Sequence, residues 1–277
     1  MKQQFFVIGH PLGHSMSPFI HSRLFVLQGK DADYGAKEIS PDKLRDELPA
    51  LLNQAGGLNV TIPYKQEVIP FLEKMEGRAA LYRSVNTIAI TPEGYIGHNT
   101  DASGFLHALE EGQIALRGRV AILGCGGAGR TFACEAARAG CTIVNAVREP
   151  NSASVELKTY VQSLVPGTDM ETVRLDELNG DFDLLINATP VGMFPHADAC
   201  PVSEAVLSRT AAVFDAVYNP HPTRLLSLAQ ANGCRIARGM AMLVWQAAEA
   251  HTIWYGARFR AEDMATLIEE AIAAMPH

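Results

Sequence analysis

Cysteine, positive charge and long apolar runs are all scarce in this chain of 277 residues, and each scarcity argues against a class of protein. The five cysteines form no Cys-x-x-Cys pair, and their odd number and wide spacing predict reduced thiols. No apolar run is long enough to span a bilayer, and the first residues lack the apolar region of a signal peptide. We therefore expect a cytoplasmic protein with no membrane partner.

Lysine and arginine total 23 against 30 aspartate and glutamate residues, which gives a formal net charge of −7. Nucleic-acid binding usually needs a basic face, so no nucleic-acid partner is expected. The charge is no obstacle to a small anionic substrate, because local groups decide that binding. Hydrophobic residues make up 48% of the chain, enough for one large domain or two small ones. We expect a monomer or a homodimer.

Short apolar runs alternate with amphipathic stretches, which predicts an α/β fold. Ser17-Pro18 and Ser40-Pro41 predict helix starts with a serine cap and proline in the first turn. We expect two α/β domains: a substrate-binding and catalytic domain of residues 1–101 with 238–277, and a Rossmann dinucleotide-binding domain of residues 102–237. Two C-terminal helices are expected to return to the first domain. The expected strands include residues 5–9, 57–61, 86–90, 95–98, 120–123, 142–147, 172–175, 184–187 and 212–214.

A glycine-rich turn follows the apolar run at 120–123 and precedes a predicted helix from about Ala128 to Ala139. Small residues let the backbone approach a pyrophosphate, and the helix start offers unpaired N–H donors. With strand and helix in place, the turn predicts nucleotide binding by Gly124, Cys125, Gly126, Gly127 and Ala128.

The next predicted strand decides which nucleotide is favoured. NAD-selective Rossmann sites place an acid at its end to hold the ribose 2′-hydroxyl, but Asn145 stands there. Arg148 follows and can pair with a 2′-phosphate, although Glu149 lies beside it. The pattern favours NADP and leaves NAD possible.

Two dense polar motifs precede the glycine turn. Residues 59–65 read Asn-Val-Thr-Ile-Pro-Tyr-Lys, and residues 97–104 read Gly-His-Asn-Thr-Asp-Ala-Ser-Gly. Lys65 and Asp101 beside a nicotinamide would make a proton-transfer pair next to a hydride acceptor, which points to an alcohol/ketone oxidoreductase. Two plainer interpretations remain: Asp101 caps its helix, and Lys65 is a solvated lysine at a helix start.

Several further motifs occur in order along nearly the whole chain. Together with residues 59–65 and 97–104, they resemble the shikimate dehydrogenase family. The motifs that carry the resemblance are residues 9–22 (Gly-His-Pro-Leu-Gly-His-Ser-Met-Ser-Pro-Phe-Ile-His-Ser), Val85-Asn86-Thr87, residues 187–193 (Asn-Ala-Thr-Pro-Val-Gly-Met), residues 215–220 (Asp-Ala-Val-Tyr-Asn-Pro) and residues 239–246 (Gly-Met-Ala-Met-Leu-Val-Trp-Gln).

The resemblance implies reversible, NADPH-dependent reduction of 3-dehydroshikimate to shikimate in aromatic amino-acid biosynthesis. Lys65 and Asp101 would be the catalytic pair. The substrate carboxylate would be held by Ser15 and Ser17, with Tyr218 nearby. The ring hydroxyls would be held by Asn59, Thr61, Asn86, Asp101 and Gln246. The cofactor would be bordered by Asn187, Thr189, Met193, Val217 and Gly239.

The chain departs from the family pattern at the end of the strand near Asn145. NADP-using members usually read Asn-Arg-Thr there, whereas this chain reads Asn145-Ala146-Val147-Arg148. An alternative within the same class is therefore a quinate/shikimate dehydrogenase with NAD or mixed cofactor use. A nucleotide-sensing regulator without turnover would not need Lys65 and Asp101 together.

No metal is expected. His14 and His21 suggest a metal site, because His10 and His14 have the spacing of ligands on a helix. But Pro11 and Gly13 lie between those two, and the chain has no His-Glu-x-x-His sequence.

Overall fold

The computed structural model describes residues 2–13 and 15–275, which form two compact units. Among these residues, the first unit takes in those up to Gly104 and those from Leu243 onward, and the second comprises Phe105–Met242. The chain passes from one unit to the other inside two helices, α4 (Asp101–Glu111) and α9 (Gly239–Tyr255). His14, considered above as a metal ligand, lies outside the described residues.

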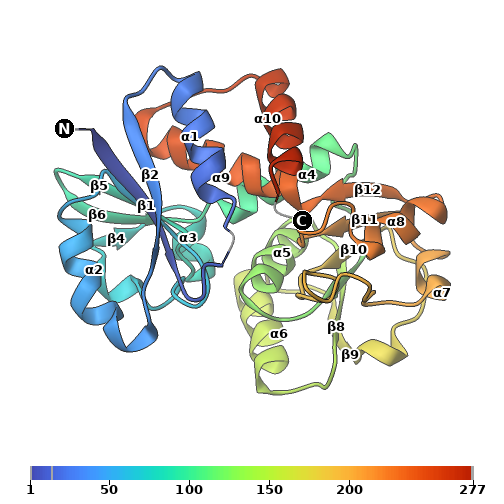
Figure 1. The fold of residues 1–277 in the computed structure, drawn as a ribbon. Coiled ribbons are helices and arrows are strands. Elements are labelled where there is room, and N and C mark those ends of the chain that lie inside the picture. Colours follow the sequence, from blue (N-terminus) through green and yellow to red (C-terminus); the bar gives the residue numbers. More distant parts are fainter. Residues whose placement is uncertain (1, 14, 276–277) are drawn as a thin grey trace. The chain divides into compact units, whose positions relative to one another are not determined.

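The first unit is built on a mixed six-stranded sheet (Figure 1). Its strand order is β2-β1-β3-β5-β6-β4. Strands β1, β2 and β3 run parallel, while β5 is antiparallel to both β3 and β6. Its strands are β1 (Gln3–Gly9), β2 (Ala32–Glu38), β3 (Gly57–Val60), β4 (Lys74–Met75), β5 (Thr87–Thr91) and β6 (Gly94–His98). Its other helices are α1 (Ser17–Leu27), α2 (Leu44–Leu52), α3 (Arg78–Tyr82) and α10 (Ala261–Ala273).

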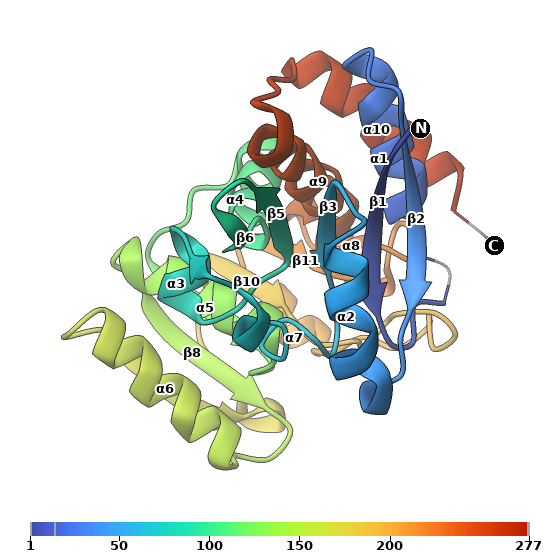
Figure 2. The ribbon, with the colours of Figure 1, turned by 90° about the vertical axis from the view of Figure 1, so that its left-hand side faces the viewer.

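Alternation along β1 explains how both faces of this sheet are covered. Phe5 and Val7 pack with Phe25 of α1, whereas Ile8 joins a core that includes Leu48 of α2. Successive side chains of a strand point to opposite faces, so one apolar strand supports two helical layers. Helices α1 and α10 contact each other and lie side by side in both views (Figures 1 and 2).

The second unit contains a parallel six-stranded sheet with the order β12-β11-β10-β7-β8-β9. Counted from its first strand, this is the Rossmann order 3-2-1-4-5-6, so the predicted α/β fold is confirmed. Its strands are β7 (Arg119–Leu123), β8 (Thr142–Val147), β9 (Met170–Arg174), β10 (Leu184–Asn187), β11 (Ala212–Asp215) and β12 (Arg235–Arg238). Its other helices are α5 (Gly127–Arg138), α6 (Ser152–Leu164), α7 (Glu204–Leu207) and α8 (Arg224–Ala231).

Helices cover the strands of this second sheet as parallel pairing requires. Helix α5 packs on β7 and β8, α6 packs on β9, and α8 packs on β11 and β12. Figure 2 shows α6 running beside β8. Within the described residues, no helix combines the length and apolar character needed to cross a bilayer.

Two expected helix starts were wrong in detail. Helix α1 begins at Ser17 itself, so Met16 is the capping residue, and its side chain makes no capping hydrogen bond. The stretch after Ser40 begins as a single 3₁₀ turn, Pro41–Lys43, before α2 starts at Leu44. In both places proline stands in the first turn, where its missing N–H has no helical partner to lose.

Candidate active site

Lys65 and Asp101 come from separate segments and meet in the first unit. The Nζ atom of Lys65 donates a hydrogen bond to Oδ2 of Asp101 at 2.5 Å. The side chains are 22% and 12% exposed, so the pair is shielded but reachable by a small molecule. The main-chain oxygen of Lys65 accepts a hydrogen bond from the N–H of Val85 at 2.7 Å, which fixes the backbone from which the lysine side chain extends. Lys65 is therefore not a freely solvated lysine.

The start of α4 is capped by Asn99 and not by Asp101. Oδ1 of Asn99 accepts from the N–H of Asp101 at 3.1 Å and from that of Ala102 at 3.4 Å. An Asn side chain satisfies the helix N–H groups well, so the Asp101 carboxylate is left for other partners. The interpretation of Asp101 as a helix cap is wrong.

Asn86 joins the predicted site residues into one network. Its Nδ2 donates to Oδ1 of Asp101 and to Oγ1 of Thr100, both at 2.9 Å. Its Oδ1 accepts from the N–H of Thr100 at 2.8 Å, which fixes the orientation of the amide. Oε1 of Gln246, on α9, accepts from the Thr100 hydroxyl at 3.3 Å. Asp101 is thus held at one oxygen by an amide and at the other by an ammonium group.

Asn59 lies behind this network on β3. Its Oδ1 accepts from the Tyr34 hydroxyl at 2.7 Å, and its Nδ2 donates to the Asn86 carbonyl at 3.2 Å and the Thr87 hydroxyl at 3.0 Å. Both amide hydrogens are therefore already used within the protein. Its role toward a substrate stays a prediction. Thr61, directly after β3, is half-buried.

Sequence reasoning assigned no supporting role to the aromatic and histidine groups that lie behind Asn59. The ring of His21 stacks on Tyr34 with centroids 4.0 Å apart, and its Nδ1 lies 3.0 Å from Nε2 of His251. Burial raises the pKa of Tyr34 well above its usual range, and burial lowers the pKa of His251 to about 3. These groups therefore stay neutral near neutral pH and brace Asn59 without adding charge.

The two serines proposed for the carboxylate lie together at the start of α1. The N–H of Ser17 donates to Oγ of Ser15 at 3.3 Å. Tyr218 belongs to the second unit, in the segment after β11, where burial raises its pKa. Its use with the serines stays a prediction.

The glycine turn of the second unit is shaped for close backbone approach. Gly124 has φ +95°, and a Cβ on Gly129 would lie 2.6 Å from the Gly124 carbonyl oxygen. Gly126 and Gly127, by contrast, face open space. Gly126, the N-cap residue of α5, has no side chain with which to cap the helix. Exposed small residues at an uncapped helix start fit a pyrophosphate, which accepts hydrogen bonds from such N–H groups. Cys125 and Ala128 complete the turn, and burial raises the pKa of the Cys125 thiol.

Asn145 ties the turn to the neighbouring strand. Its Nδ2 donates to the Ile122 carbonyl at 3.0 Å and to the Gly124 carbonyl at 2.9 Å. Its Oδ1 is buried and has no hydrogen-bond partner among residues 2–13 and 15–275. A buried unpaired acceptor beside a nucleotide turn fits a site built to meet a further donor. Arg148 is exposed one residue beyond β8.

The other predicted cofactor residues surround Asp215, which sequence reasoning did not select. Its Oδ1 accepts from Nδ2 of Asn187 at 2.9 Å and from the N–H of Val217 at 3.0 Å, and its Oδ2 accepts from Thr223 at 2.6 Å. Oδ1 of Asn187 in turn accepts from the Thr189 hydroxyl at 2.7 Å. Asp215 therefore fixes the ends of β10 and β11.

Gly239 and Met193 also lie in this part of the second unit. Gly239 begins α9 so close to the end of β11 that a Cβ would lie 2.7 Å from the Asp215 carbonyl oxygen. Met193 is 46% exposed. Glycine is therefore needed for packing at 239, and the cofactor roles of both residues stay predictions.

Asp215 leads to a prediction about stability and pH. Burial raises the pKa of its carboxyl from the ordinary 3.8 to about 6, against the effect of its hydrogen bonds. Between these two values the folded protein binds more protons than the unfolded chain. The stabilisation that the Asp215 carboxyl contributes to the folded protein is therefore fully present below about pH 4 and is lost as pH rises through about 6.

The test compares the wild type with Asp215→Asn, which cannot titrate. The free energy of unfolding of the wild type, minus that of the variant, should fall by about 3 kcal/mol as pH rises through this window. Urea unfolding at a series of pH values measures this difference. The contributions of the other titrating groups to the free energy cancel in it. A difference that does not change with pH would contradict the assignment.

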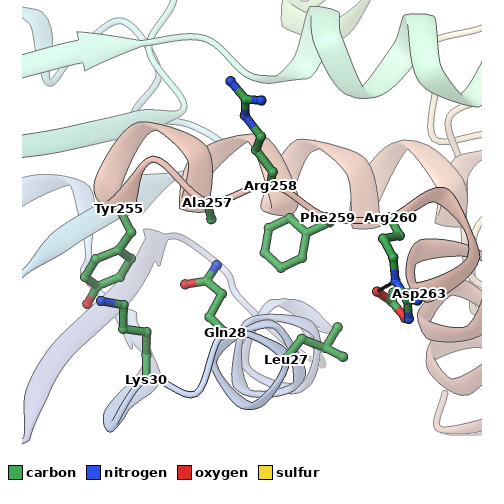
Figure 3. A pocket seen from close by; sticks show the side chains of 9 residues that line it. All are labelled: Leu27, Gln28, Lys30, Tyr255, Ala257, Arg258, Phe259, Arg260 and Asp263. Atoms are coloured by element: carbon green, nitrogen blue, oxygen red, sulfur yellow. Dashed lines mark hydrogen bonds and ion pairs between the residues drawn. The ribbon is translucent and has the colours of Figure 1, made fainter.

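A separate hollow of about 420 Å³ lies in the first unit, where the end of α1 faces the segment after α9 (Figure 3). Gln28 points between Tyr255 and Phe259, and Lys30 lies over the Tyr255 ring with its Nζ 4.7 Å from the centroid. None of the predicted site residues lines this hollow. Within the described ranges, no group of three or more His, Cys, Asp or Glu side chains could hold a metal ion.

Comparison with known proteins identifies the family. A family model described as the shikimate dehydrogenase substrate binding domain matches residues 7–88. The shikimate dehydrogenase (NADP(+)) of Archaeoglobus fulgidus is 37% identical over 274 residues, which cover 97% of each chain. The chain belongs to the shikimate dehydrogenase family.

Solved structures of shikimate dehydrogenases match over nearly the full length. A crystal structure of a shikimate dehydrogenase in complex with NADP⁺ has a TM-score of 0.89 at 33% identity and covers 98% of this chain and 96% of its own. The shikimate 5-dehydrogenase from Thermus thermophilus, in complex with NADP(H) and shikimate, has a TM-score of 0.86 at 31% identity, with coverage of 97% and 99%. The family membership thus extends to both units and is not limited to the matched residues 7–88.

Proposed function

We propose that this protein is an NADP-dependent shikimate dehydrogenase that interconverts 3-dehydroshikimate and shikimate. The observation that carries the proposal is the Lys65–Asp101 pair, shielded in the first unit and held by Asn86. The second unit supplies a Rossmann sheet whose glycine turn is open to a pyrophosphate. The names of the relatives and the ligands in the matched structures support the same assignment.

Lys65 and Asp101 together provide proton transfer and charge stabilisation at the reacting oxygen. A ketone that gains hydride at carbon develops negative charge on its oxygen. The Lys65 ammonium stabilises that charge and donates the proton, which completes the alcohol; in the reverse direction the amine accepts the proton. Asp101 orients the lysine, and its second oxygen is fixed by Asn86. The remaining acceptor sites of the carboxylate can bind a ring hydroxyl next to the ketone.

NADPH, when bound, supplies the hydride to the ketone carbon. Gly124, Cys125, Gly126, Gly127 and Ala128 would hold its pyrophosphate through main-chain N–H groups at the start of α5. Asn145 keeps the turn against its strand, and Arg148 would pair with a 2′-phosphate. Asn187, Thr189, Met193, Val217 and Gly239 would border the rest of the cofactor.

The substrate would be bound by hydroxyl and amide groups of the first unit. Ser15 and Ser17 offer hydroxyls to its carboxylate, while Thr61, Asn86 and Gln246 offer polar atoms to its ring hydroxyls. The assignments of Asn59 to a ring hydroxyl and of Tyr218 to the carboxylate stay predictions. We further propose a cytoplasmic location, in keeping with five free thiols, a monomer or homodimer, and no nucleic-acid or membrane partner.

The test measures formation of the reduced nicotinamide by absorbance. Purified protein is given shikimate with NADP⁺, then with NAD⁺, and the same pair of assays is repeated with quinate. The proposal expects the highest kcat/KM for shikimate with NADP⁺. Equal or greater turnover of quinate would replace the substrate assignment. No turnover of either compound with either cofactor, by folded protein, would refute the activity.

A further inference from the structure

A second polar hollow, in the Rossmann unit, has a volume of about 540 Å³. Its polar wall consists of Arg148 and Glu149, just beyond the end of β8, and Arg174 and Asp176, at and after the end of β9. Leu178 and Val202 are among its apolar residues. Because β8 and β9 are parallel and Val147 pairs with Arg174, these four charged side chains meet at one edge of the sheet.

Arg174 is shared between two carboxylates. Its Nη1 donates to both oxygens of Glu149 at 2.7 and 2.8 Å, and its Nε and Nη2 donate to Asp176 at 3.1 Å each. The Arg174 side chain is 39% exposed, and those of Glu149 and Asp176 are 66% and 68% exposed. Exposed ion pairs contribute little, from about 0 to 1 kcal/mol each. The two carboxylates therefore orient Arg174 without preventing it from changing partners.

The cluster of Arg148, Glu149, Arg174 and Asp176 lies close to where a Rossmann sheet binds the ribose of a dinucleotide. In a Rossmann sheet the pyrophosphate lies at the turn after the first strand, and the adenosine ribose lies at the end of the second. Here these are the Gly124 turn after β7 and the end of β8. A substituent on the ribose 2′ position would thus be near the ends of β8 and β9. An acid at this place suits a hydroxyl, and an arginine suits a phosphate.

We propose that Arg174, together with Arg148, binds the 2′-phosphate of the cofactor, and that Glu149 limits the preference for the phosphorylated form. This inference rests on the proposed nucleotide role of the second unit. In the free protein Nη1 of Arg174 donates to both oxygens of Glu149, while Nε and Nη2 of Arg174 are held by Asp176. A 2′-phosphate displaces Glu149 from Nη1, because the phosphate brings more charge and its oxygens also accept charge-assisted hydrogen bonds. With an unphosphorylated ribose, Glu149 keeps Arg174 and no displacement is needed.

The test uses adenosine 2′,5′-bisphosphate and adenosine 5′-monophosphate as probes, titrated into the full-length protein by calorimetry. Arg174→Ala should weaken binding of the bisphosphate about tenfold, since a charge-assisted hydrogen bond to the 2′-phosphate is lost. Glu149→Gln should strengthen its binding about threefold, because the competing charge is gone. Neither variant should change binding of the monophosphate more than about twofold.

Arg209→Ala is the matched control. Arg209 also makes a two-pronged pair with a carboxylate, Asp181, in the same unit, but both residues precede their strands. The carboxyl ends, where ribose would lie, are at the other edge of the sheet. Binding of both probes should therefore be unchanged in this variant.

The outcomes separate this proposal from the function on which it rests. If the wild type binds both probes and Arg174→Ala leaves the bisphosphate unaffected, or weakens both probes equally, the phosphate role of Arg174 is wrong while the nucleotide site stands. If Glu149→Gln weakens the bisphosphate, Glu149 is not its competitor. If the wild type binds neither probe, the nucleotide role of the second unit fails and this inference fails with it.

Discussion

Replacement of Lys65 by methionine is expected to lower kcat about 10³-fold, within the range seen when a positioned proton donor is removed. Methionine fills a similar volume but offers neither a proton nor a positive charge to the developing oxyanion. Asp101 keeps its bond to Asn86 at 2.9 Å, so the carboxylate should stay in place. Steady-state turnover of shikimate with NADP⁺ measures the loss, and fluorescence titration with NADP⁺ should show unchanged cofactor binding.

Lys74→Met provides the matched control for this experiment. Lys74 also pairs with a carboxylate in the first unit, since its Nζ lies 2.8 Å from Glu76, but its side chain is 47% exposed. The kcat of the Lys74→Met variant should stay within about twofold of the wild-type value, because an exposed ion pair contributes little free energy. A Lys65→Met variant with more than about a tenth of the wild-type kcat would show that another group moves the proton.

The Lys65–Asp101 pair could be predicted from sequence because both residues lie in short motifs dense in polar groups, each next to a strand. What could not be predicted was which of two capping residues holds the start of α4. Asn99 and Asp101 both belong to types that cap helices, and only the structure shows Asn99 accepting the helix N–H groups. That choice determines whether the Asp101 carboxylate is available for chemistry.

The residues that brace the site were missed for a different reason. Tyr34 reaches Asn59 across 25 positions of the chain, and it does so from β2, a largely exposed edge strand without a clear apolar alternation. Strand β12 was missed on similar grounds, because Arg235 and Arg238 stand at its ends. Edge strands have weak patterns of alternating apolar and polar residues in the sequence, since only part of their surface must be apolar. Asp215 is likewise recognisable only once its three donors are assembled around it.

In the glycine turn, the structure separates residues needed for packing from those needed for a ligand. A methyl group at Gly129 would press against the Gly124 carbonyl oxygen, 2.6 Å from the new carbon, whereas at Gly126 it would meet open space. Gly129→Ala should therefore lower the free energy of unfolding by about 1 to 3 kcal/mol, as overpacking does. Gly126→Ala should change it by less than about 1 kcal/mol, the usual range for a helix-capping position.

Nucleotide affinity should respond most strongly to the substitution at Gly126. Its backbone has φ −72° and ψ −169°, which alanine adopts freely, so the free turn should keep its shape. The added methyl group would occupy the space through which a pyrophosphate reaches the N–H groups of α5. Loss of one such charge-assisted contact predicts about a 10- to 100-fold weaker NADP⁺ complex. Calorimetric titration and urea unfolding of both variants test the pair of expectations. If Gly126→Ala binds NADP⁺ like the wild type, the open face of the turn is not where the pyrophosphate lies, because the alanine methyl group would otherwise have to overlap it.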